Sequence, residues 1–510
     1  MTVSRSLLVV PLLLGVLSGT ARAQELGERD VIARVLERNP SYRASLADRR
    51  AIRAAMRGAE GDRSASFTAS ATGTYTERIT NTAAGVAGTT EERIGFTTGL
   101  AYTTSWGLGV TFDVEGGVGW RAVNRDPSTT MIFQIGPSYD TTATLGLRQP
   151  LLRGAGEDSV LGAVREAEAN RRSADATAEN ELSQLLSDAL SAHWELWYAS
   201  RAFEVQEQAL VLGERQVAEA ELRAGDLGTI ARTEVLRLAA DLAQIRRTHA
   251  SAETTVATSA ITVGRLLGYE TSETDVLRAL RELPLLEEPP GLPSLIEGAR
   301  QRSPELVALA ADVEAARIAL ARARDAAEVR LDLTGELAAG VLFTNTTIDT
   351  FQLPNGRPAL IAMVGLELEV PLGPSGADGD AEVADAQLEA AELRLEIRAR
   401  ELEAEIATLR AELVRGLRDV TLAEEAAAAA HALAEAERQS FELGLSEAFT
   451  VVEAQQSERT AALEHLRAVA DYATAQVELM HRTGHLLELH GVTLPDGVTL
   501  PDGVTLPEVN

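Results

Sequence analysis

Paired histidines are the first feature of this 510-residue chain that could do chemistry. His481 and His485 are four residues apart, a spacing that places both imidazoles on one helix face, where they could bind zinc. No Glu follows His481 as a zinc-protease motif requires, and Gly484 weakens a helix at this point. The pair therefore favours helix packing over a metal site.

Two further patterns resemble functional motifs. The sequence Arg153-Gly154-Ala155-Gly156 lacks the Gly-Lys-Ser/Thr of a phosphate-binding loop and indicates a strand-to-helix turn. Trp194, Trp197 and Tyr198 indicate helix packing rather than a ligand cage. No Ser/His/Asp constellation stands out, although residues distant in the chain could still form one. We therefore expect no enzyme and no cofactor, and an enzyme on a helical scaffold is the weakest alternative.

Charge and composition exclude several classes of protein. The chain has 76 acidic and 47 basic residues, a formal charge of −29, and no lysine. Such a negative chain argues against nucleic acid as the main partner. The absence of cysteine excludes disulfides, cysteine zinc sites and a cysteine-linked lipid anchor. Ala, Leu, Glu and Arg dominate, which is typical of long helices and coiled coils.

The first 23 residues are typical of a signal peptide. Arg5 precedes the apolar run Leu7–Leu17, and Ala21-Arg22-Ala23 forms a small-x-small cleavage site before Gln24. An uncleaved N-terminal anchor is the alternative. No other stretch reaches about 18 apolar residues, so an exported chain of this kind does not enter a membrane with helices.

The rest of the chain reads as two repeats, each with an opening helix, strands, a long helix, a sharp turn and a second helix. The first repeat spans residues 24–283, with strands at about 66–148 and a helical hairpin over 158–267. The second spans residues 294–490, with strands at about 329–370 and a hairpin over 378–485. A Pro-rich linker, residues 284–293, separates the repeats, and the low-complexity tail 491–510 follows them.

Helix lengths reinforce the repeat. The two long helices, 158–223 and 378–443, would each run about 100 Å at 1.5 Å per residue. The opening helices are expected over 28–60 and 294–328. Heptad-like spacing of Leu182, Leu186, Ala189, His193 and Leu196, and again of Leu402, Ile406, Leu409 and Leu413, indicates coiled-coil packing. The helices alone would equally suit a soluble coiled coil.

The alternation of apolar and polar residues in the strand regions favours a membrane protein over a soluble coiled coil. One set of apolar residues is odd-numbered: Val329, Leu331, Leu333, Leu337, Val341 and Phe343. A second set is even-numbered: Leu360, Ala362, Val364, Leu366, Leu368 and Val370. Charged residues such as Arg330, Asp332 and Glu367 lie between them, as in strands with one apolar face. Runs of 11–15 residues suit tilted transmembrane strands, which need about 9–11 residues, although a soluble sandwich can show the same alternation.

The first repeat has a longer alternating run, from Ile94 to Val114. A single strand of this length would extend about 70 Å, far beyond an apolar band of about 25 Å, so it must turn back. Equal parity on both arms requires an odd-length loop, and Ser105-Trp106-Gly107 fits a three-residue hairpin turn. Up to four strands are expected here, and two in the second repeat. The candidates for an aromatic girdle are Tyr75, Tyr102, Trp106, Trp120 and Tyr139.

Six strands from one chain are too few for a wide barrel. Several chains sharing one closed barrel would leave no strand edge in lipid. The residues thus indicate an α+β membrane protein, with long coiled-coil helices and a transmembrane antiparallel β-barrel that several chains share.

Short motifs at the ends of the strand regions carry a family resemblance. The sequence from Gln149 to Gly154 resembles the TolC-like outer membrane efflux protein family, and Val370-Pro371-Leu372-Gly373 resembles its second copy. Ala192-His193-Trp194-Glu195-Leu196 is similar to the family's aromatic signature, with His193 in place of the common tyrosine. The sequence departs from the family pattern by lacking a proline between opening helix and first strand, and by exceeding the usual two strands per repeat.

The resemblance implies a homotrimer in the outer membrane with a large periplasmic portion. Its fold would be a long α-helical coiled-coil barrel joined to the transmembrane antiparallel β-barrel. The resemblance also implies a passive duct of a tripartite efflux pump or type I secretion system, working with a periplasmic adaptor and an inner-membrane transporter. A periplasmic adaptor with a long helical hairpin is the alternative function, but an adaptor has one hairpin within split β-domains, whereas this chain has two.

Candidate site residues follow from this architecture. Pro150 and Pro371 are expected at strand-to-helix junctions, because proline ends a strand ladder. The hairpin tips, at Gly228 and at Gly444-Leu445-Ser446, are candidates for adaptor docking. Asp226, Glu435 and Glu442 are candidates for a periplasmic gate, where threefold symmetry would turn carboxylates into cation-selective rings. Ordinary solvated helix residues are the alternative for each acid.

Overall fold

The computed structural model describes residues 24–82, 85–124, 132–225, 231–270, 277–280, 283–284, 286–344, 359–373, 375–443 and 445–492. The expected signal peptide and the tail beyond Val492 lie outside these residues. The described residues divide into two compact units: the first lies within 24–46, 178–304 and 400–492, and the second within 47–177 and 305–399.

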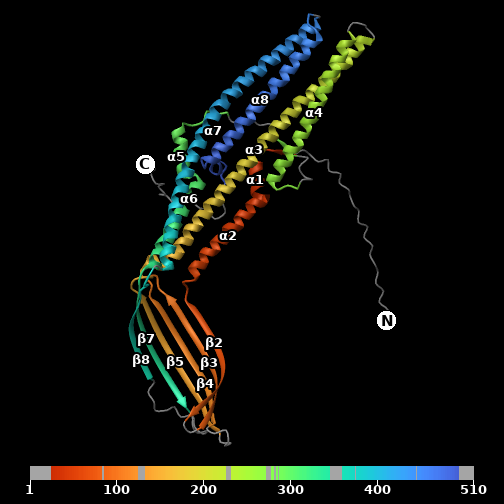
Figure 1. The fold of residues 1–510 in the computed structure, drawn as a ribbon. Helices are drawn as coiled ribbons and strands as arrows, with labels where there is room; N and C mark the ends of the chain where they lie inside the picture. Colours follow the sequence, from red (N-terminus) through yellow and green to blue (C-terminus); the bar gives the residue numbers. More distant parts are fainter. Residues whose placement is uncertain are drawn as a thin grey trace, which may run out of the picture. The chain divides into compact units, whose positions relative to one another are not determined.

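An antiparallel sheet dominates the second unit (Figure 1). Among the described residues it has six strands in the order β2-β3-β4-β5-β7-β8. Four come from the first strand region and two from the second, which agrees with the number expected from the alternation. The strands are β2 (Ser66–Thr82), β3 (Gly85–Thr103), β4 (Gly109–Asn124), β5 (Ile132–Pro150), β7 (Arg330–Thr344) and β8 (Ala359–Glu369).

The turn between β3 and β4 lies where the parity of the sequence predicted it. The backbone N–H of Thr104 donates to the carbonyl of Leu108 at 2.9 Å, which encloses the three residues Ser105, Trp106 and Gly107. Gly107 has φ = 95°, a left-handed conformation that a side chain would strain. The register pairs Tyr102 with Val110 and Leu100 with Phe112, so apolar residues of both arms share one face.

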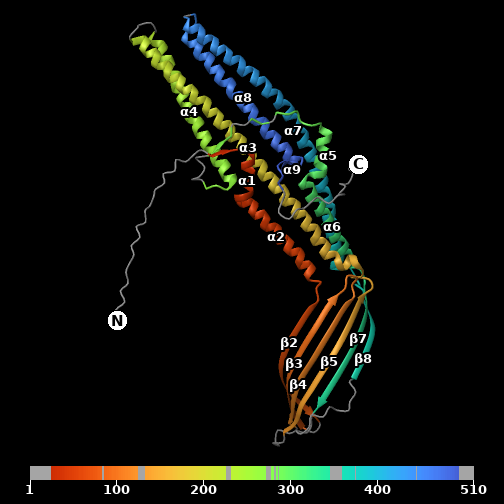
Figure 2. The same ribbon diagram turned by 180° about the vertical axis from the view of Figure 1, so that it is seen from behind.

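Two long helices, α3 (Glu157–Gly225) and α7 (Gly376–Glu442), follow the strands and contribute to both units. In the first unit α4 (Arg232–Leu267) lies along α3, and α8 (Ala448–Arg482) along α7 (Figures 1 and 2). No helix among the described residues combines the length and apolar character that a membrane span requires.

The expectation of continuous opening helices was wrong. The first is divided into α1 (Glu28–Arg38) and α2 (Pro40–Gly61), and the second into α5 (Leu292–Arg302) and α6 (Pro304–Ala327). Asn39 and Ser303 have ψ of 125° and 115°, because a following proline disfavours the helical conformation. Each break is extended backbone, not a bend within one helix.

The heptad positions form the core of the first unit. Leu182, Leu186, Ala189, His193 and Leu196 are all buried on α3. On α7, Leu402, Ile406 and Leu413 are buried, whereas Leu409 is only half-buried. Trp194 and Trp197 meet edge to face at 5.8 Å between ring centroids, and the Nε1–H of Trp194 donates to Glu28. The tryptophans therefore pack helices, as the sequence indicated.

A short parallel pair of strands was not expected from the sequence. Strand β1 (Gln24–Leu26) pairs with β6 (Leu277–Ala279), and Leu26 and Leu277 are fully buried. Three-residue strands are too short to show a period, and their partners are about 250 residues apart. The last described helix is α9 (Leu486–Leu489).

Candidate functional site

The six-stranded sheet has one face of large apolar side chains that no other described element covers. A continuous row of paired residues crosses all six strands on this face: Phe67, Leu100, Phe112, Leu145, Leu337 and Ala362. Phe67 is 67% exposed, and even Leu145 on a central strand is 37% exposed. An exposed apolar surface of this extent marks contact with lipid or another protein.

The opposite face of the sheet is polar and built largely from small residues. Its rows pair Thr68 with Gly99 and Asp113 with Thr144. A cavity of about 1140 Å³ opens on this face near the ends of the strands that join the helices. Residues that line it include Thr111, Asp113, Thr144, Arg148, Thr334 and Glu336. The sheet therefore separates an apolar surface from a surface that water can wet.

The candidate girdle residues fall at two levels along the strands. Tyr102 is one residue from the helix-proximal end of β3, and Trp106 lies in the adjoining turn. At the other level, Tyr75 is nine residues from that end of its strand, and Trp120 and Tyr139 are each eleven residues away. All five are exposed. Strands tilted by about 40° would place these levels about 25 Å apart, the height of the apolar band in outer-membrane barrels.

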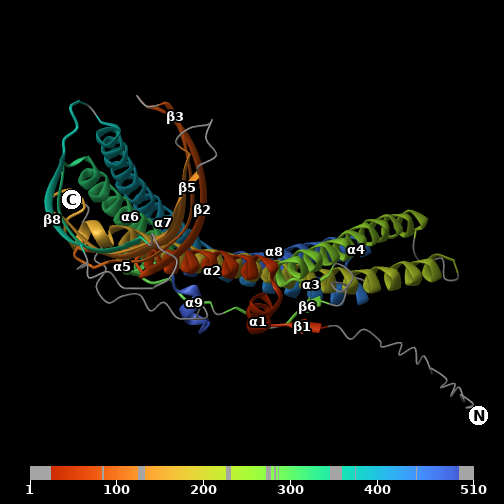
Figure 3. The ribbon, with the colours of Figure 1, turned by 90° about the horizontal axis from the view of Figure 1, so that it is seen from below.

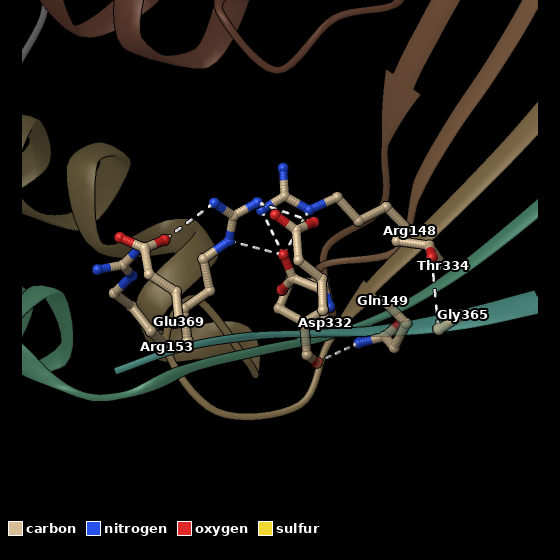
Figure 4. Close-up of polar contacts among 10 residues, drawn as sticks. Arg148, Gln149, Arg153, Asp332, Thr334, Gly365 and Glu369 are labelled. Atoms are coloured by element: carbon tan, nitrogen blue, oxygen red, sulfur yellow. Dashed lines mark hydrogen bonds and ion pairs between the residues drawn. The ribbon is translucent and has the colours of Figure 1, made fainter. Parts of the chain in front are cut away.

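Charged residues on the polar face join strands of the two strand regions (Figure 4). Asp332 on β7 is fully buried and accepts hydrogen bonds from Arg148 on β5 and Arg330 on β7, at 2.9 and 2.7 Å between heavy atoms. Arg330 and Arg153 both contact Glu369 on β8, at 3.3 and 3.2 Å. Burying one carboxylate between two guanidinium groups makes these pairs short and charge-assisted.

The turn that leads from β5 into α3 is fixed by a second carboxylate, Asp325 on α6. The backbone N–H of Gly154 donates to both Asp325 oxygens at 3.1 Å, and the Ser159 hydroxyl donates to Oδ2 at 2.8 Å. Gly154 and Gly156 have φ of 81° and 87°, so the glycines supply the left-handed backbone of the turn. The glycine-rich motif is thus a strand-to-helix turn, as the sequence indicated.

The two candidate junction prolines lie at the ends of their strands. Pro150 is the last residue of β5, seven residues before α3 begins at Glu157. Pro371 is exposed and follows the end of β8 at Glu369, and α7 begins at Gly376. Their energetic role stays a prediction.

Of the candidate hairpin-tip residues, Gly228 and Gly444 lie outside the described residues, as does the gate candidate Asp226. Of the second tip, Leu445 is 79% exposed, and Ser446 donates a hydrogen bond to Glu437 at 2.7 Å. An exposed leucine on a helix-hairpin turn offers an apolar contact for a partner.

The two described gate candidates, Glu435 and Glu442, share an arginine that the sequence reasoning did not consider. Arg438 forms an ion pair with Glu435 at 2.7 Å and with Glu442 at 2.9 Å. The hydrogen bond from Arg438 is the largest cause that lowers the pKa of Glu435 to about 2. The spacing of three and four residues could have revealed both pairs in the sequence.

Among the described residues, no cluster of three or more His, Cys, Asp or Glu side chains around His481 and His485 could hold a metal ion. His481 is buried, and its Nδ1 lies 2.8 Å from the Ser183 hydroxyl. Burial lowers the pKa of His485 below its ordinary value. Both histidines thus belong to helix packing.

Comparison with known proteins bears on the family. Residues 295–485 match the family model "Outer membrane efflux protein". This match confirms the family resemblance drawn from the sequence, and with it the expected outer-membrane location and periplasmic helical part. A comparison with curated protein sequences gives no match.

Solved structures of outer membrane proteins share the fold. The channel CmeC of Campylobacter jejuni is 13% identical, with a TM-score of 0.65 and coverage of 95% of this chain and 94% of that one. VceC of Vibrio cholerae is 15% identical, with a TM-score of 0.64 and coverage of 90% and 96%. The channel MtrE of Neisseria gonorrhoeae is 15% identical, with a TM-score of 0.61 and coverage of 92% and 93%. At these identities the likeness establishes the fold.

Proposed function

We propose that this relative of the outer membrane efflux proteins is the exit duct of a tripartite efflux pump or a type I secretion system. It acts as a passive conduit for substrates that an inner-membrane transporter and a periplasmic adaptor deliver. Three copies form the duct, each with two repeats, residues 24–283 and 294–490. The chemistry of such a duct is selection by width and charge, without a catalytic group.

The uncovered apolar face of the sheet is the observation that carries this proposal. Water would leave Phe67, Leu100 and Phe112 exposed at a cost of about 25 cal/mol per Å² of apolar surface, whereas lipid covers them. The two levels of aromatic residues about 25 Å apart support the same assignment. A soluble helical adaptor would expose such a face to water.

The edges of the sheet support assembly from several copies. Among the described residues β2 pairs only with β3, and β8 only with β7. Unpaired backbone groups cannot remain in the hydrocarbon core of a membrane, so each edge requires a further strand. A closed barrel of identical chains satisfies both edges and encloses the polar face as a lumen.

Partners and the gate complete the proposal. Leu445 and Ser446, with Gly228 and Gly444, form the tips that dock on the adaptor, and Pro150 and Pro371 mark the strand-to-helix junctions. Glu435 and Glu442, with Asp226, line the periplasmic gate.

Fractionation of cells that produce the full chain tests the duct. We expect the protein in the outer membrane, extractable only with detergent and trimeric by native mass spectrometry. Loss of the gene should sensitise cells to a panel of toxic compounds or abolish secretion of a protein. Recovery with the inner membrane would instead support an adaptor and contradict the duct.

A further inference from the structure

The extra hairpin of the first strand region changes the size of the barrel that the chain can build. The family pattern has two strands per repeat, whereas this sheet has four strands from the first region and two from the second. All six pair in one antiparallel sheet, with paired residues that place the large apolar side chains on one face. The hairpin therefore belongs to the wall and does not lie over it.

The two edges of the sheet complement each other. Strand β2 runs away from the helix-proximal end and β8 runs toward it, so β8 of one copy and β2 of the next would be antiparallel. The large apolar residues of β2 are odd-numbered, and on β8 Leu360, Val364, Leu366 and Leu368 are even-numbered, although Ile361 and Met363 are odd-numbered. The edge residues Phe67 and Val364 are 67% and 84% exposed. Figure 3 shows the sheet curving between these two edges.

The register of the sheet limits how the edges can meet. The paired row that starts at Phe67, one residue inside β2, ends at Ala362, seven residues from the end of β8. The row thus climbs six residues from edge to edge. Pairing β8 with β2 of the next copy should continue this displacement along the strands. Only even displacements keep the apolar residues on the same face, so Ala362 would pair with Gly73 or Tyr75 of the next copy.

These two registers correspond to shifts of six and eight residues per chain. With strands about 4.8 Å apart and a rise of about 3.3 Å per residue, they give strand tilts of about 35° and about 42°. Both values lie within the range of outer-membrane barrels, about 35–45°. A heterologous contact between two different edges closes into a ring when the rotation between copies permits it.

We propose that three chains close an eighteen-stranded barrel through a seam between β8 of one copy and β2 of the next. The proposal rests on the trimer of the proposed function and adds its strand number and its seam. Eighteen tilted strands give a backbone diameter of about 35 Å, against about 24 Å for twelve. Small residues such as Gly99 and Thr68 on the lumen face preserve that width.

Cysteine cross-linking of the full-length protein tests the seam, because the chain has no cysteine of its own. Met363→Cys is combined with Thr72→Cys for the shift of six, and with Thr74→Cys for the shift of eight. Within one chain β2 and β8 are five strand steps apart, more than about 20 Å, so a disulfide must join two copies. Met363→Cys with Gly73→Cys is the matched control, because residue 73 points to the opposite face.

We expect oxidation of one of the two pairs to give covalent dimers and trimers and nothing larger. The control pair and each single variant should stay uncrosslinked. A trimer by native mass spectrometry that links through neither pair overturns the seam but leaves the duct intact. If cross-linking stops at the covalent dimer, two chains with twelve strands form the barrel, and the proposed number of eighteen is wrong. A monomeric unmodified protein overturns the trimer of the proposed function together with this inference.

Permeation by sized polyethylene glycols through the unmodified protein in planar bilayers is the second measurement. Polymers about 20 Å across, added from the extracellular side, should enter a lumen of about 25 Å and lower the conductance. Their exclusion would indicate a lumen nearer the width of a twelve-stranded barrel and would contradict the proposal.

Discussion

Phe67 and Leu186 are both large apolar side chains in regular secondary structure, yet Phe67 is 67% exposed and Leu186 is fully buried. Phe67 lies on the sheet, where small polar residues occupy the opposite face. Leu186 lies on α3, where the apolar stripe faces other helices and the charged residues face outward. The sheet therefore exposes its large apolar side chains, whereas the helices bury theirs.

This difference shows that the solvent, not the residue type, decides which face of an element is stable. A helical stripe with a period of 3.5 residues needs a protein partner to cover it. An alternating strand needs an apolar environment only on one of its two faces, and in the proposed duct lipid supplies it. Substitutions should therefore have opposite consequences in the two regions.

The largest effect is expected from Leu186→Ala. This substitution removes a fully buried side chain, which costs about 2–5 kcal/mol of unfolding free energy. Leu145→Ala on the apolar face of the sheet should cost much less, because it leaves no cavity in the protein. Denaturant unfolding in detergent, followed by circular dichroism, compares the two. Equal losses would contradict the difference between the regions.

Phe96→Arg tests whether the apolar face of the sheet tolerates a charged side chain. Phe96 lies between the two aromatic levels on the apolar face, where an arginine costs about 2–4 kcal/mol near the middle of the bilayer. Its neighbour Thr97 points to the polar face, so Thr97→Arg should assemble normally. The measurement is the yield of heat-modifiable trimer in outer-membrane fractions. Similar yields of both variants would show that the faces are misassigned.

Acid should weaken the helical core through His193. Burial lowers the pKa of this side chain to about 4 from its ordinary 6.5. The unfolded chain therefore takes up the proton first, so stability is complete above pH 6.5 and falls as the pH drops toward 4. The loss is at most about 3 kcal/mol. His193→Gln should remove this component, seen as a smaller difference in midpoint between pH 7 and pH 4.5. An unchanged difference would mean that water reaches His193.

The smallest effect concerns the charge of the proposed gate residues. With Arg438 between them, Glu435 and Glu442 together contribute a net charge of −1 and not −2. Replacing both with Gln leaves Arg438 alone and should lower cation selectivity in planar bilayers, whereas Arg438→Gln should raise it. If neither variant moves the reversal potential, these side chains do not face the ion path.

Some features of the fold could be predicted because they are local. The parity of Ile94 to Val114 and the glycine at position 107 located the β3–β4 hairpin within one residue. Heptad spacing identified the buried residues of α3 and α7. The breaks at Asn39 and Ser303 were equally local, since each precedes a proline, but the surrounding helical periodicity concealed them.

The charged residues of the site could not be predicted to the same degree. Arg148 and Asp332 are 184 residues apart, and alternation fixes only the face on which each lies, not the register that pairs their strands. The ion pairs of Arg438 needed no such register, and the i,i+3 and i,i+4 spacing was sufficient to indicate them.

The pairing of β5 with β7 has a consequence for how the chain reaches its native state. Ile132–Pro150 emerges from synthesis long before Arg330–Thr344, with about 180 residues of helix-forming sequence between them. Contacts so distant in sequence form slowly, and until then the hairpins β2–β3 and β4–β5 expose an aggregation-prone apolar surface. We therefore expect an exported chain with this order of strands to need chaperones that shield its first four strands until the last two are made.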